Sequence, residues 1–513
     1  MQTESRTKKS FKNAYFNLFN QILAVIIQFV IRTVFIRTLS IEYLGVNGLF
    51  SNILSVLSLT ELGLGTALIT NMYGPIARDD KPEIVKYFRV YKKVYSYIGA
   101  IIGLVGLAIT PFIHNLVADA NSIPNLKLLY VLYLGDTVAS YFFAQYRALF
   151  SADQKDYVNA NNRTFFLIIQ SAAQIVSLFI FHSYIVYMGI KIGCNLLSGL
   201  VLSIKAKKQY PYISAREDYS LSKEEKNLLV HDSVGVLSTR VELTVLNSTD
   251  TIILSSILGS VVSGLYSNYS LIVSTISTLA GMIFSSLQAS IGNYCVQKDK
   301  EDAQRLYSNV GYVYYCIYGA ATICLIGLLT PTIAIWLGND YVLAEQIAWI
   351  ISINFYISNS RQANLQFITV FHLLPKLNAK NIIEALMNIV ISIVLVKKIG
   401  LIGIFLGTAI SLLSTSAWYE PFVLYKNKWG PGIAKYFCKY LIQLLVVIAS
   451  SFLVVLINNH LFTGNLISLI GCFILTAFIS GMAVTIPFVR TKEFLFVLSS
   501  IKTLTKNRLG GTK

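Results

Sequence analysis

Long apolar runs recur along the whole chain, and each has about the length that a helix needs to cross a hydrocarbon core. The runs are continuous and do not alternate between apolar and polar residues, so they indicate helices rather than barrel strands. The pattern predicts an all-α polytopic membrane protein of about 14 transmembrane helices. The expected spans are 13–38, 44–72, 94–113, 126–150, 160–181, 184–204, 229–257, 261–294, 308–330, 343–371, 378–397, 401–424, 438–458 and 465–488.

A short motif near the start of the second span returns in the eighth. Gly48-Leu-Phe-Ser-Asn52 recurs as Gly264-Leu-Tyr-Ser-Asn268, and further pairs follow in the same order at a nearly constant offset. These pairs are Gly65 with Gly281, Gly99 with Gly319, Thr110-Pro111 with Thr330-Pro331, and Asn159-Ala160 with Asn378-Ala379. The repeat predicts two parallel six-helix bundles around a central cavity, an architecture typical of transporters that rock one half against the other.

The repeat also predicts how the chain is divided. We expect an N-terminal six-helix bundle over 1–204, a cytoplasmic linker over 205–228 and a second bundle over 229–424. Two extra helices over 438–488 and a cytoplasmic tail over 489–513 would complete the chain.

Composition and charge narrow the class of function. Of the 513 residues, 55% are hydrophobic and only 13% are charged, and the net charge is +17. In a soluble protein this charge would suggest nucleic acid, but here the basic residues cluster in alternate loops, as the positive-inside rule requires. Both termini are therefore expected in the cytoplasm, with the lipid bilayer and not nucleic acid as partner. The outer loops are too short for an enzyme's active site, and the scattered cysteines and histidines predict no metal site.

The first expected span, 13–38, carries a polar stripe. Asn17, Gln21, Gln28 and Arg32 recur at multiples of about four residues, so they share one face. A charge in the middle of a membrane helix costs roughly 2.5 to 3.5 kcal/mol on insertion scales. Arg32 is therefore expected either to line a water-filled cavity or to snorkel to the interface.

Other cations lie inside predicted spans. Arg240 and Asn247 lie in the span 229–257, the repeat partner of the first span, whereas Arg361 lies in the span 343–371 and Lys191 in the span 184–204. Guanidinium groups bind phosphate oxygens bidentately, so these cations suit a phosphate or pyrophosphate in a cavity. Ion pairing within the helix bundle is the alternative, because acids such as Glu61 and Asp136 also lie in spans. The candidate substrate site comprises Arg32, Arg240, Arg361, Gln28, Asn247 and Lys191.

Oxygen-bearing side chains form a candidate cation site. Glu384 and Asn388 share a face of the span 378–397, and Asp250 lies in the span 229–257. Hard cations take oxygen ligands, so this set could couple transport to Na⁺ or H⁺ without any other cofactor. A buried polar contact that locks two helices together is the alternative.

Three segments carry a family resemblance. Leu44-Gly-Val-Asn-Gly-Leu-Phe50, Glu61-Leu-Gly-Leu-Gly-Thr-Ala67 and Tyr146-Arg-Ala-Leu-Phe-Ser-Ala-Asp-Gln-Lys155 resemble the Wzx-type oligosaccharide repeat-unit flippases, a branch of the MOP exporter superfamily related to lipid II flippases. The resemblance covers essentially the whole chain in topology.

The resemblance implies a function in the bacterial cytoplasmic membrane. Such a protein moves undecaprenyl-pyrophosphate-linked oligosaccharide repeat units from the inner to the outer leaflet for capsule or O-antigen assembly, alongside a polysaccharide polymerase and assembly proteins. It also implies that Arg32 and Arg240 engage the diphosphate, that Asp250, Glu384 and Asn388 hold a cation, and that helices 13 and 14 form a groove for the polyprenyl tail.

Two other functions remain open. An ion-coupled small-molecule exporter of the multidrug type, from the same superfamily, would share the repeat, although a cationic drug favours acidic cavity residues over arginines. A membrane-embedded glycan polymerase or glycosyltransferase would need a sizeable external loop, which the sequence does not provide.

Overall fold

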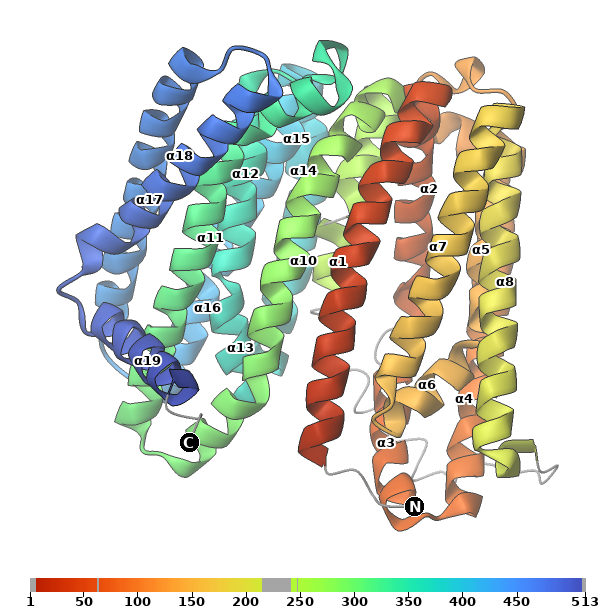
Figure 1. Cartoon of the computed structure of the whole chain (residues 1–513), viewed down its shortest axis with the longest axis horizontal. Helices are drawn as coiled ribbons and strands as arrows, with labels where there is room; N and C mark the ends of the chain where they lie inside the picture. The colour runs from red at the N-terminus through yellow and green to blue at the C-terminus, as the bar shows by residue number, and fades with distance from the viewer. Residues whose placement is uncertain (1–5, 62–63, 215–240, 247, 510–513) are drawn as a thin grey trace. The chain divides into compact units, whose positions relative to one another are not determined.

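The computed structural model describes residues 6–61, 64–214, 241–246 and 248–509. Within these residues the regular elements are helices and no strand occurs, which confirms the all-α prediction (Figure 1). Among them, 9 helices are long and apolar enough to cross a membrane, or up to 10 if a bent pair counts as one span. The chain is therefore a multi-pass membrane protein.

Several expected spans are interrupted in the structure. The span predicted over 44–72 consists of α2 (Ile41–Leu57), the 3₁₀ turn η1 (Ser58–Glu61) and α3 (Leu64–Arg78). The span over 126–150 bends by 42° between α5 (Leu126–Tyr141) and α6 (Ala144–Ala152). Hydropathy measures length and apolar content but does not report such breaks, so the count of about 14 spans stays a prediction.

Contacts between residues divide the chain into two compact units, Met1–Gly264 and Leu265–Lys513. The domain boundaries expected from the repeat stay a prediction. The central cavity expected between the two bundles also stays a prediction. Besides the elements above, the N-terminal unit contains α1 (Arg6–Thr38), α4 (Lys81–Ile109), η2 (Thr110–Leu116), η3 (Ala120–Ser122), α7 (Asp156–Phe181), α8 (Tyr184–Gln209), η4 (Pro211–Ser214), helical residues 241–246 and 248–257, and the start of α10 (Ser260–Gln297).

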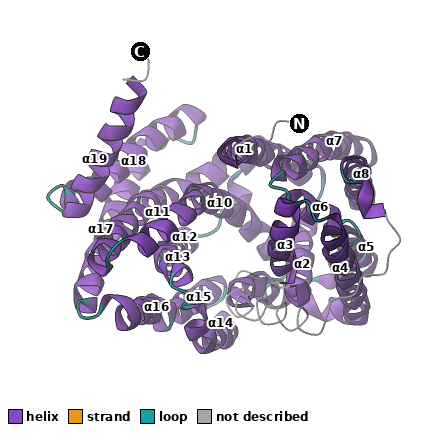
Figure 2. Ribbon diagram, turned by 90° about the horizontal axis from the view of Figure 1, so that it is seen from below, coloured by secondary structure: helices purple, strands orange, loops and turns teal. Residues whose placement is uncertain are grey.

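The N-terminal unit buries polar groups between helices and exposes apolar ones. Helix α1 packs along α7, where the Asn20 amide donates to Asn161 Oδ1 at 2.9 Å. Phe179 and Phe181, near the end of α7, are about 60% exposed. An exposed apolar surface of this kind suits contact with lipid, because water would disfavour it. Helices α2, α3, α4 and α5 lie side by side when the unit is viewed along its helices (Figure 2).

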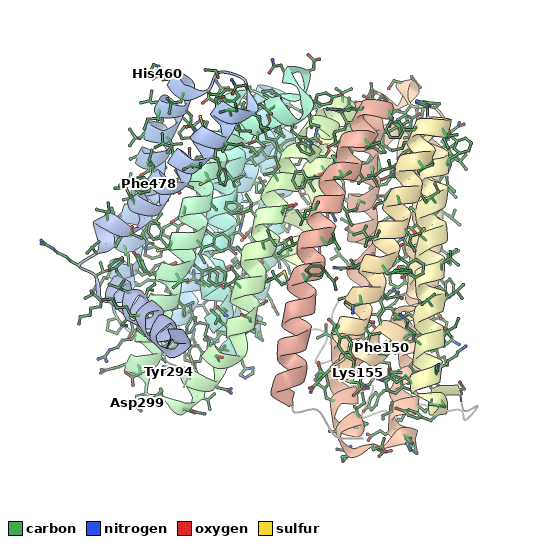
Figure 3. All side chains as sticks on the ribbon, in the orientation of Figure 1. Phe150, Lys155, Tyr294, Asp299, His460 and Phe478 are labelled. Atoms are coloured by element: carbon green, nitrogen blue, oxygen red, sulfur yellow. The ribbon has the colours of Figure 1, made fainter. Side chains whose placement is uncertain are left out.

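The C-terminal unit is organised around α11 (Lys300–Leu337), which contacts most of its neighbours. The other elements are the rest of α10, η5 (Asn339–Tyr341), α12 (Glu345–Ser360), α13 (Gln362–Val370), η6 (Leu374–Leu377), α14 (Asn378–Ile399), α15 (Leu401–Ser414), α16 (Ser416–Leu424), the π-helical turn η7 (Tyr425–Trp429), α17 (Ile433–Leu461), α18 (Leu466–Thr485), η8 (Ile486–Phe488) and α19 (Lys492–Leu509). Phe478 on α18 projects outward and is 65% exposed, as a lipid-facing side chain would be (Figure 3).

Two glycines let α14 and α15 approach closely. Gly403 and Gly407 are four residues apart on α15, and a Cβ on Gly407 would lie 2.8 Å from the backbone nitrogen of Ser392 on α14. A Cβ on Gly403 would overlap the carbonyl group of Leu395. This spacing is the small-residue pattern with which membrane helices pack backbone to backbone. The close contact fixes the position of α14, which carries Glu384 and Asn388.

Replacing Gly407 by alanine should therefore destabilise the C-terminal unit. Forcing a methyl group against backbone atoms costs about 1–3 kcal/mol, so we expect a lower unfolding temperature for detergent-solubilised Gly407→Ala. Gly471→Ala is the matched control, since a Cβ at this helical position meets nothing within 4 Å. Equal unfolding temperatures for the two variants would contradict the close approach of α14 and α15.

Candidate functional site

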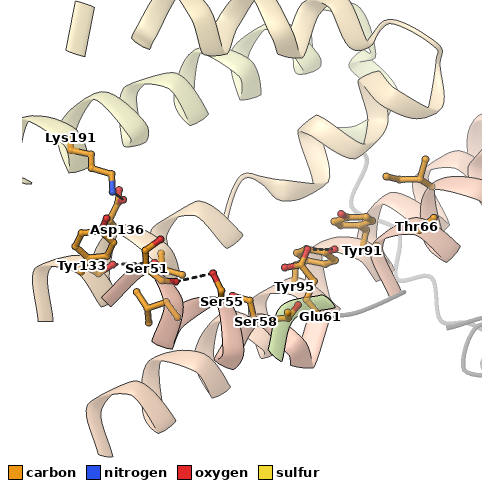
Figure 4. Close-up of a pocket in the computed structure, with 15 residues that line it drawn as sticks. Ser51, Ser55, Ser58, Glu61, Thr66, Tyr91, Tyr95, Tyr133, Asp136 and Lys191 are labelled. Carbon is orange, nitrogen blue, oxygen red and sulfur yellow. Dashed lines mark hydrogen bonds and ion pairs between the residues drawn. The ribbon is translucent and has the colours of Figure 1, made fainter. Parts of the chain in front are cut away.

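A polar cavity of about 660 Å³ lies within the N-terminal unit (Figure 4). It is lined by α2, η1, α3, α4, α5, α8 and the helical residues 241–246, and most of its side chains carry hydroxyl or charged groups. The lining residues are Ser51, Leu54, Ser55, Ser58, Glu61, Gly65, Thr66, Ile69, Tyr91, Tyr95, Tyr133, Asp136, Thr137, Lys191 and Thr244. We call this site the N-terminal cavity.

One end of the N-terminal cavity is built around the ion pair between Lys191 and Asp136. Lys191 Nζ lies 3.2 Å from Asp136 Oδ2 and 4.2 Å from the centre of the Tyr133 ring. The other carboxylate oxygen of Asp136 accepts a hydrogen bond of 2.7 Å from Asn195. Residues 191 and 195 are one helical turn apart on α8, so one face of this helix satisfies both oxygens. The buried carboxylate is thereby neutralised, and the Lys191 side chain remains 25% exposed to the cavity.

The other end combines a carboxylate with stacked aromatic rings. Tyr95 donates a hydrogen bond of 2.7 Å to Glu61 Oε1, and its ring stacks on that of Tyr91 with centroids 4.2 Å apart. Gly65 on α3 lies against the Tyr95 hydroxyl, in a place where a Cβ would collide with it. A smaller cavity of about 310 Å³ shares Glu61 and both tyrosines and is also lined by Arg147. Both tyrosines are buried, with 5% and 3% of their surface exposed, so Glu61 is the group at this end that can exchange hydrogen bonds with a ligand.

Some of the predicted site residues of the N-terminal unit lie at the N-terminal cavity and others do not. Lys191 lines the cavity, and the half-buried Arg32 lies close to Tyr133 and Tyr187, so it is a neighbour of the same end. Gln28 is exposed and does not line the N-terminal cavity. Arg240 and Asn247 lie outside the described residues.

The structure places Arg361 in the alternative arrangement that the sequence leaves open, an ion pair within the helix bundle. Its Nη1 lies 3.1 Å from Glu420 Oε1 and 3.5 Å from Glu384 Oε1. Lys380 Nζ lies 3.2 Å from Glu384 Oε2 and 3.3 Å from Glu420 Oε1. All four side chains are at most 4% exposed. We call Arg361, Lys380, Glu384 and Glu420 the ion cluster; its two cations and two anions balance, and a role for Arg361 in substrate binding stays a prediction.

The ion cluster bears on the expected cation site. Glu384 Oε2 accepts from Thr415 Oγ1 at 2.6 Å and from Ser416, in addition to Lys380. Both carboxylate oxygens of Glu384 are thus engaged by groups of the protein, and its role as a cation ligand stays a prediction. Asn388 donates to Thr408 Oγ1 at 3.0 Å, which is the expected polar contact between two helices. Asp250 is buried in the N-terminal unit, and the assignment of a coupling ion stays a prediction.

The sequence matches a known protein family. Residues 10–288 match the family described as polysaccharide biosynthesis protein, which is more than half of the chain. The chain belongs to this family. The comparison with curated protein sequences gave no match.

Solved structures of membrane transporters share the fold of this chain. It is similar to the lipid II flippase MurJ in an inward closed conformation, with 15% identity, a TM-score of 0.63, and coverage of 94% of this chain and 100% of the other. It is also similar to a multidrug resistance MATE family transporter of the MOP superfamily. The inward-facing form has 14% identity and a TM-score of 0.61 over 82% of this chain and 100% of the other. The outward-facing form has 16% identity and a TM-score of 0.52 over 81% and 96%. The family match confirms the predicted polysaccharide family, and these structures show that the chain shares the transporter fold.

Sequence reasoning missed most of the N-terminal cavity. Ser51, Ser55 and Ser58 recur at intervals of three or four residues toward the end of α2, so a polar stripe was present in the sequence. Tyr91 and Tyr95 have the same spacing on α4. These residues are uncharged and common in membrane helices, so they did not stand out beside the arginines.

The pairing of Lys191 with Asp136 predicts a stability that depends on both charges. Lys191→Met should lower the free energy of unfolding by about 1–3 kcal/mol, because it leaves the Asp136 carboxylate incompletely paired. Asp136→Asn combined with Lys191→Met should recover most of this loss, since no charge then remains. Denaturant unfolding checks the prediction, with Lys207→Met on the exposed end of α8 as control. A double variant as unstable as Lys191→Met would contradict the pairing.

The ion cluster gives a second prediction. Arg361→Met should destabilise the protein by about 3–5 kcal/mol, because it leaves an excess negative charge in a buried site. Lys397→Met, which removes an exposed cation from the same unit, should leave the unfolding temperature unchanged. Normal stability of Arg361→Met together with lost transport would instead favour the predicted role of Arg361 in substrate binding.

Proposed function

We propose that this protein is a flippase that moves undecaprenyl-pyrophosphate-linked oligosaccharide repeat units from the inner to the outer leaflet of the bacterial cytoplasmic membrane. The proposal includes cytoplasmic termini, alternating access, and a place before polymerisation in capsule or O-antigen assembly. Membership of the polysaccharide biosynthesis family supports the substrate class, and the fold shared with a lipid II flippase supports the type of transport. The observation that carries the proposal is the polar N-terminal cavity inside a membrane-spanning unit.

The N-terminal cavity has the chemistry of a site for the sugars. Hydroxyl groups from α2, η1 and α5 and the carboxylate of Glu61 can exchange hydrogen bonds with sugar hydroxyls. The stacked rings of Tyr91 and Tyr95 line the cavity beside Glu61, and the Tyr95 hydroxyl holds the Glu61 carboxylate in place. Arg32 and Lys191, both near Tyr133, would then lie on the side from which the pyrophosphate could be bound.

An apolar groove in the C-terminal unit suits the polyprenyl tail. Its volume is about 390 Å³, and its lining comes from α10, α11 and α18, with Leu328, Ile470 and Phe473 among the residues. Only Thr332 and Cys324 in this lining carry a polar atom. An isoprenoid chain gains by burial of its apolar surface, so a groove of this composition supports a lipid-linked substrate over a fully soluble one.

A small-molecule exporter of the multidrug type is the second candidate. Glu61 beside two tyrosine rings could also bind an organic cation, through charge and cation–π attraction. The fold is similar to that of a MATE family transporter as well as to that of the flippase. The two functions differ in what accumulates when the protein is lost.

Mass spectrometry of polyprenyl-linked glycans in a strain without this protein tests the proposal. The strain should accumulate lipid-linked repeat units and lose surface polysaccharide, and the wild-type protein should restore both. Glu61→Gln should lower the restored flux about tenfold or more, since a hydrogen bond to a charged group contributes about 1.5–3 kcal/mol. Tyr97→Phe, at an exposed position of α4, is the control and should restore fully. A strain that accumulates no lipid-linked glycan but becomes sensitive to organic cations would indicate the exporter.

A further inference from the structure

A second pocket lies in the C-terminal unit, at the end where α11 and α17 begin. Its volume is about 750 Å³, and α19 contributes Lys492, Glu493 and Phe496 to its lining. The lining carries four basic side chains against two acidic ones, together with six tyrosines. The basic residues are Arg305, Lys435, Lys439 and Lys492, and the acidic ones are Glu301 and Glu493. We call this site the tyrosine pocket.

Two buried hydroxyl groups in the tyrosine pocket have no hydrogen-bond partner in the part of the chain that the structure describes. Tyr315 and Tyr356 are 2% and 1% exposed, and the hydroxyl of neither bonds to any described residue. Nearby hydroxyls differ: Tyr307 donates to Asn364 Oδ1 at 2.7 Å, and the Asn364 amide donates to the Tyr436 hydroxyl at 3.1 Å. A buried polar group without a partner destabilises the fold, because it has lost its hydrogen bonds to water. The two unpaired donors therefore point to a ligand that accepts hydrogen bonds.

The electrostatics of the tyrosine pocket favour an anion. Lys439 Nζ is held 2.8 Å from Glu493 Oε1. Burial alone raises the pKa of Glu493, but the hydrogen bond from Lys439 and the charges of Lys439 and Lys435 lower it below its ordinary value, so Glu493 stays ionised. Arg305 Nη1 lies 3.5 Å from Asp302 Oδ1 in an exposed pair, so Lys435 and Lys492 remain against Glu301 in the lining of the pocket. Helix α17 begins at Ile433 with no acid in its first turn and no side-chain cap, so its N-terminal dipole adds to the positive field beside Lys435.

The position of α19 indicates that the anion belongs to a lipid. This helix follows the spans of α17 and α18 and packs on α11 (Figure 1). Leu495 and Phe496 on α19 are about half exposed, although charged residues begin the helix. A helix with exposed apolar side chains beside basic ones suits the membrane interface. Phe496 also lines the tyrosine pocket, so acyl chains would continue from the pocket along α19.

We propose that the tyrosine pocket binds the phosphate group of an anionic lipid headgroup, through Lys435, Arg305 and the hydroxyls of Tyr315 and Tyr356. The lipid is a ligand of the C-terminal unit and not the transported substrate. The proposal does not depend on the function of the N-terminal cavity, because it concerns other residues and a binding equilibrium.

Titration of the purified full-length protein in detergent tests the site, with binding followed by native mass spectrometry and by the unfolding temperature. Three probes are used: dihexanoyl-phosphatidylglycerol, the corresponding diacylglycerol without phosphate, and inorganic phosphate. The phosphatidylglycerol should bind and raise the unfolding temperature, whereas the other two should bind at least about tenfold more weakly, the equivalent of one charge-assisted contact.

Substitutions in the tyrosine pocket test whether phosphatidylglycerol binds there. Tyr356→Phe keeps the ring and removes one unpaired hydroxyl, and Lys435→Ala removes an exposed cation, so both should fold. Each should weaken phosphatidylglycerol binding about tenfold, the equivalent of one hydrogen bond to a charged group. Tyr312→Phe is the matched control, because its hydroxyl already donates to the Val484 carbonyl oxygen at 3.2 Å, and it should bind as the wild type does.

Three results would overturn the proposal. They are no binding of phosphatidylglycerol, binding that Tyr356→Phe and Lys435→Ala leave unchanged, and inorganic phosphate binding as tightly as the lipid. The last would show a simple anion site. Loss of glycan transport in cells bears on the proposed function alone, since none of these titrations requires transport.

Discussion

A charged side chain inside a membrane helix bundle is stable only where an opposite charge or strong hydrogen bonds replace the water it has lost, and this constraint shapes both units. In the N-terminal unit it is met by Lys191, Asp136 and Asn195, and in the C-terminal unit by the ion cluster. The cationic side chains of these two arrangements differ in how much of their surface is exposed. Lys191 keeps a quarter of its side chain open to a cavity, whereas Arg361 and Lys380 are almost completely enclosed.

This difference in exposure separates residues that can meet a substrate from those that hold helices together. The N-terminal cavity has one balanced ion pair, one further carboxylate and several hydroxyls, which together suit a polar ligand. The ion cluster joins α14 and α16 to the junction of α12 and α13. The glycines of α15 hold α14 in place for it. The first arrangement is therefore the one that we propose to bind substrate, and the second holds the helices of the C-terminal unit together.

The sequence was sufficient for the class of fold, because long apolar runs have few other interpretations in a chain of this composition. It could not predict which charges pair. Asp136 and Lys191 lie on different helices, and so do Arg361 and Glu420; periodicity reports the face of one helix but not what that face meets. Breaks such as the bend between α5 and α6 were also invisible, since the residues there remain apolar. The predicted Arg240 and Asn247 lie outside the described residues.

The measurement that tests the account most directly is translocation by the purified protein in liposomes. A fluorescent undecaprenyl-pyrophosphate oligosaccharide would be placed in both leaflets, and its exposure to a reagent that cannot cross the bilayer would be followed with time. The account predicts that the wild-type protein makes the inner pool accessible, that Glu61→Gln slows this step, and that protein-free liposomes protect the pool. A pool that stays protected with wild-type protein, while the same liposomes move an organic cation, would contradict it.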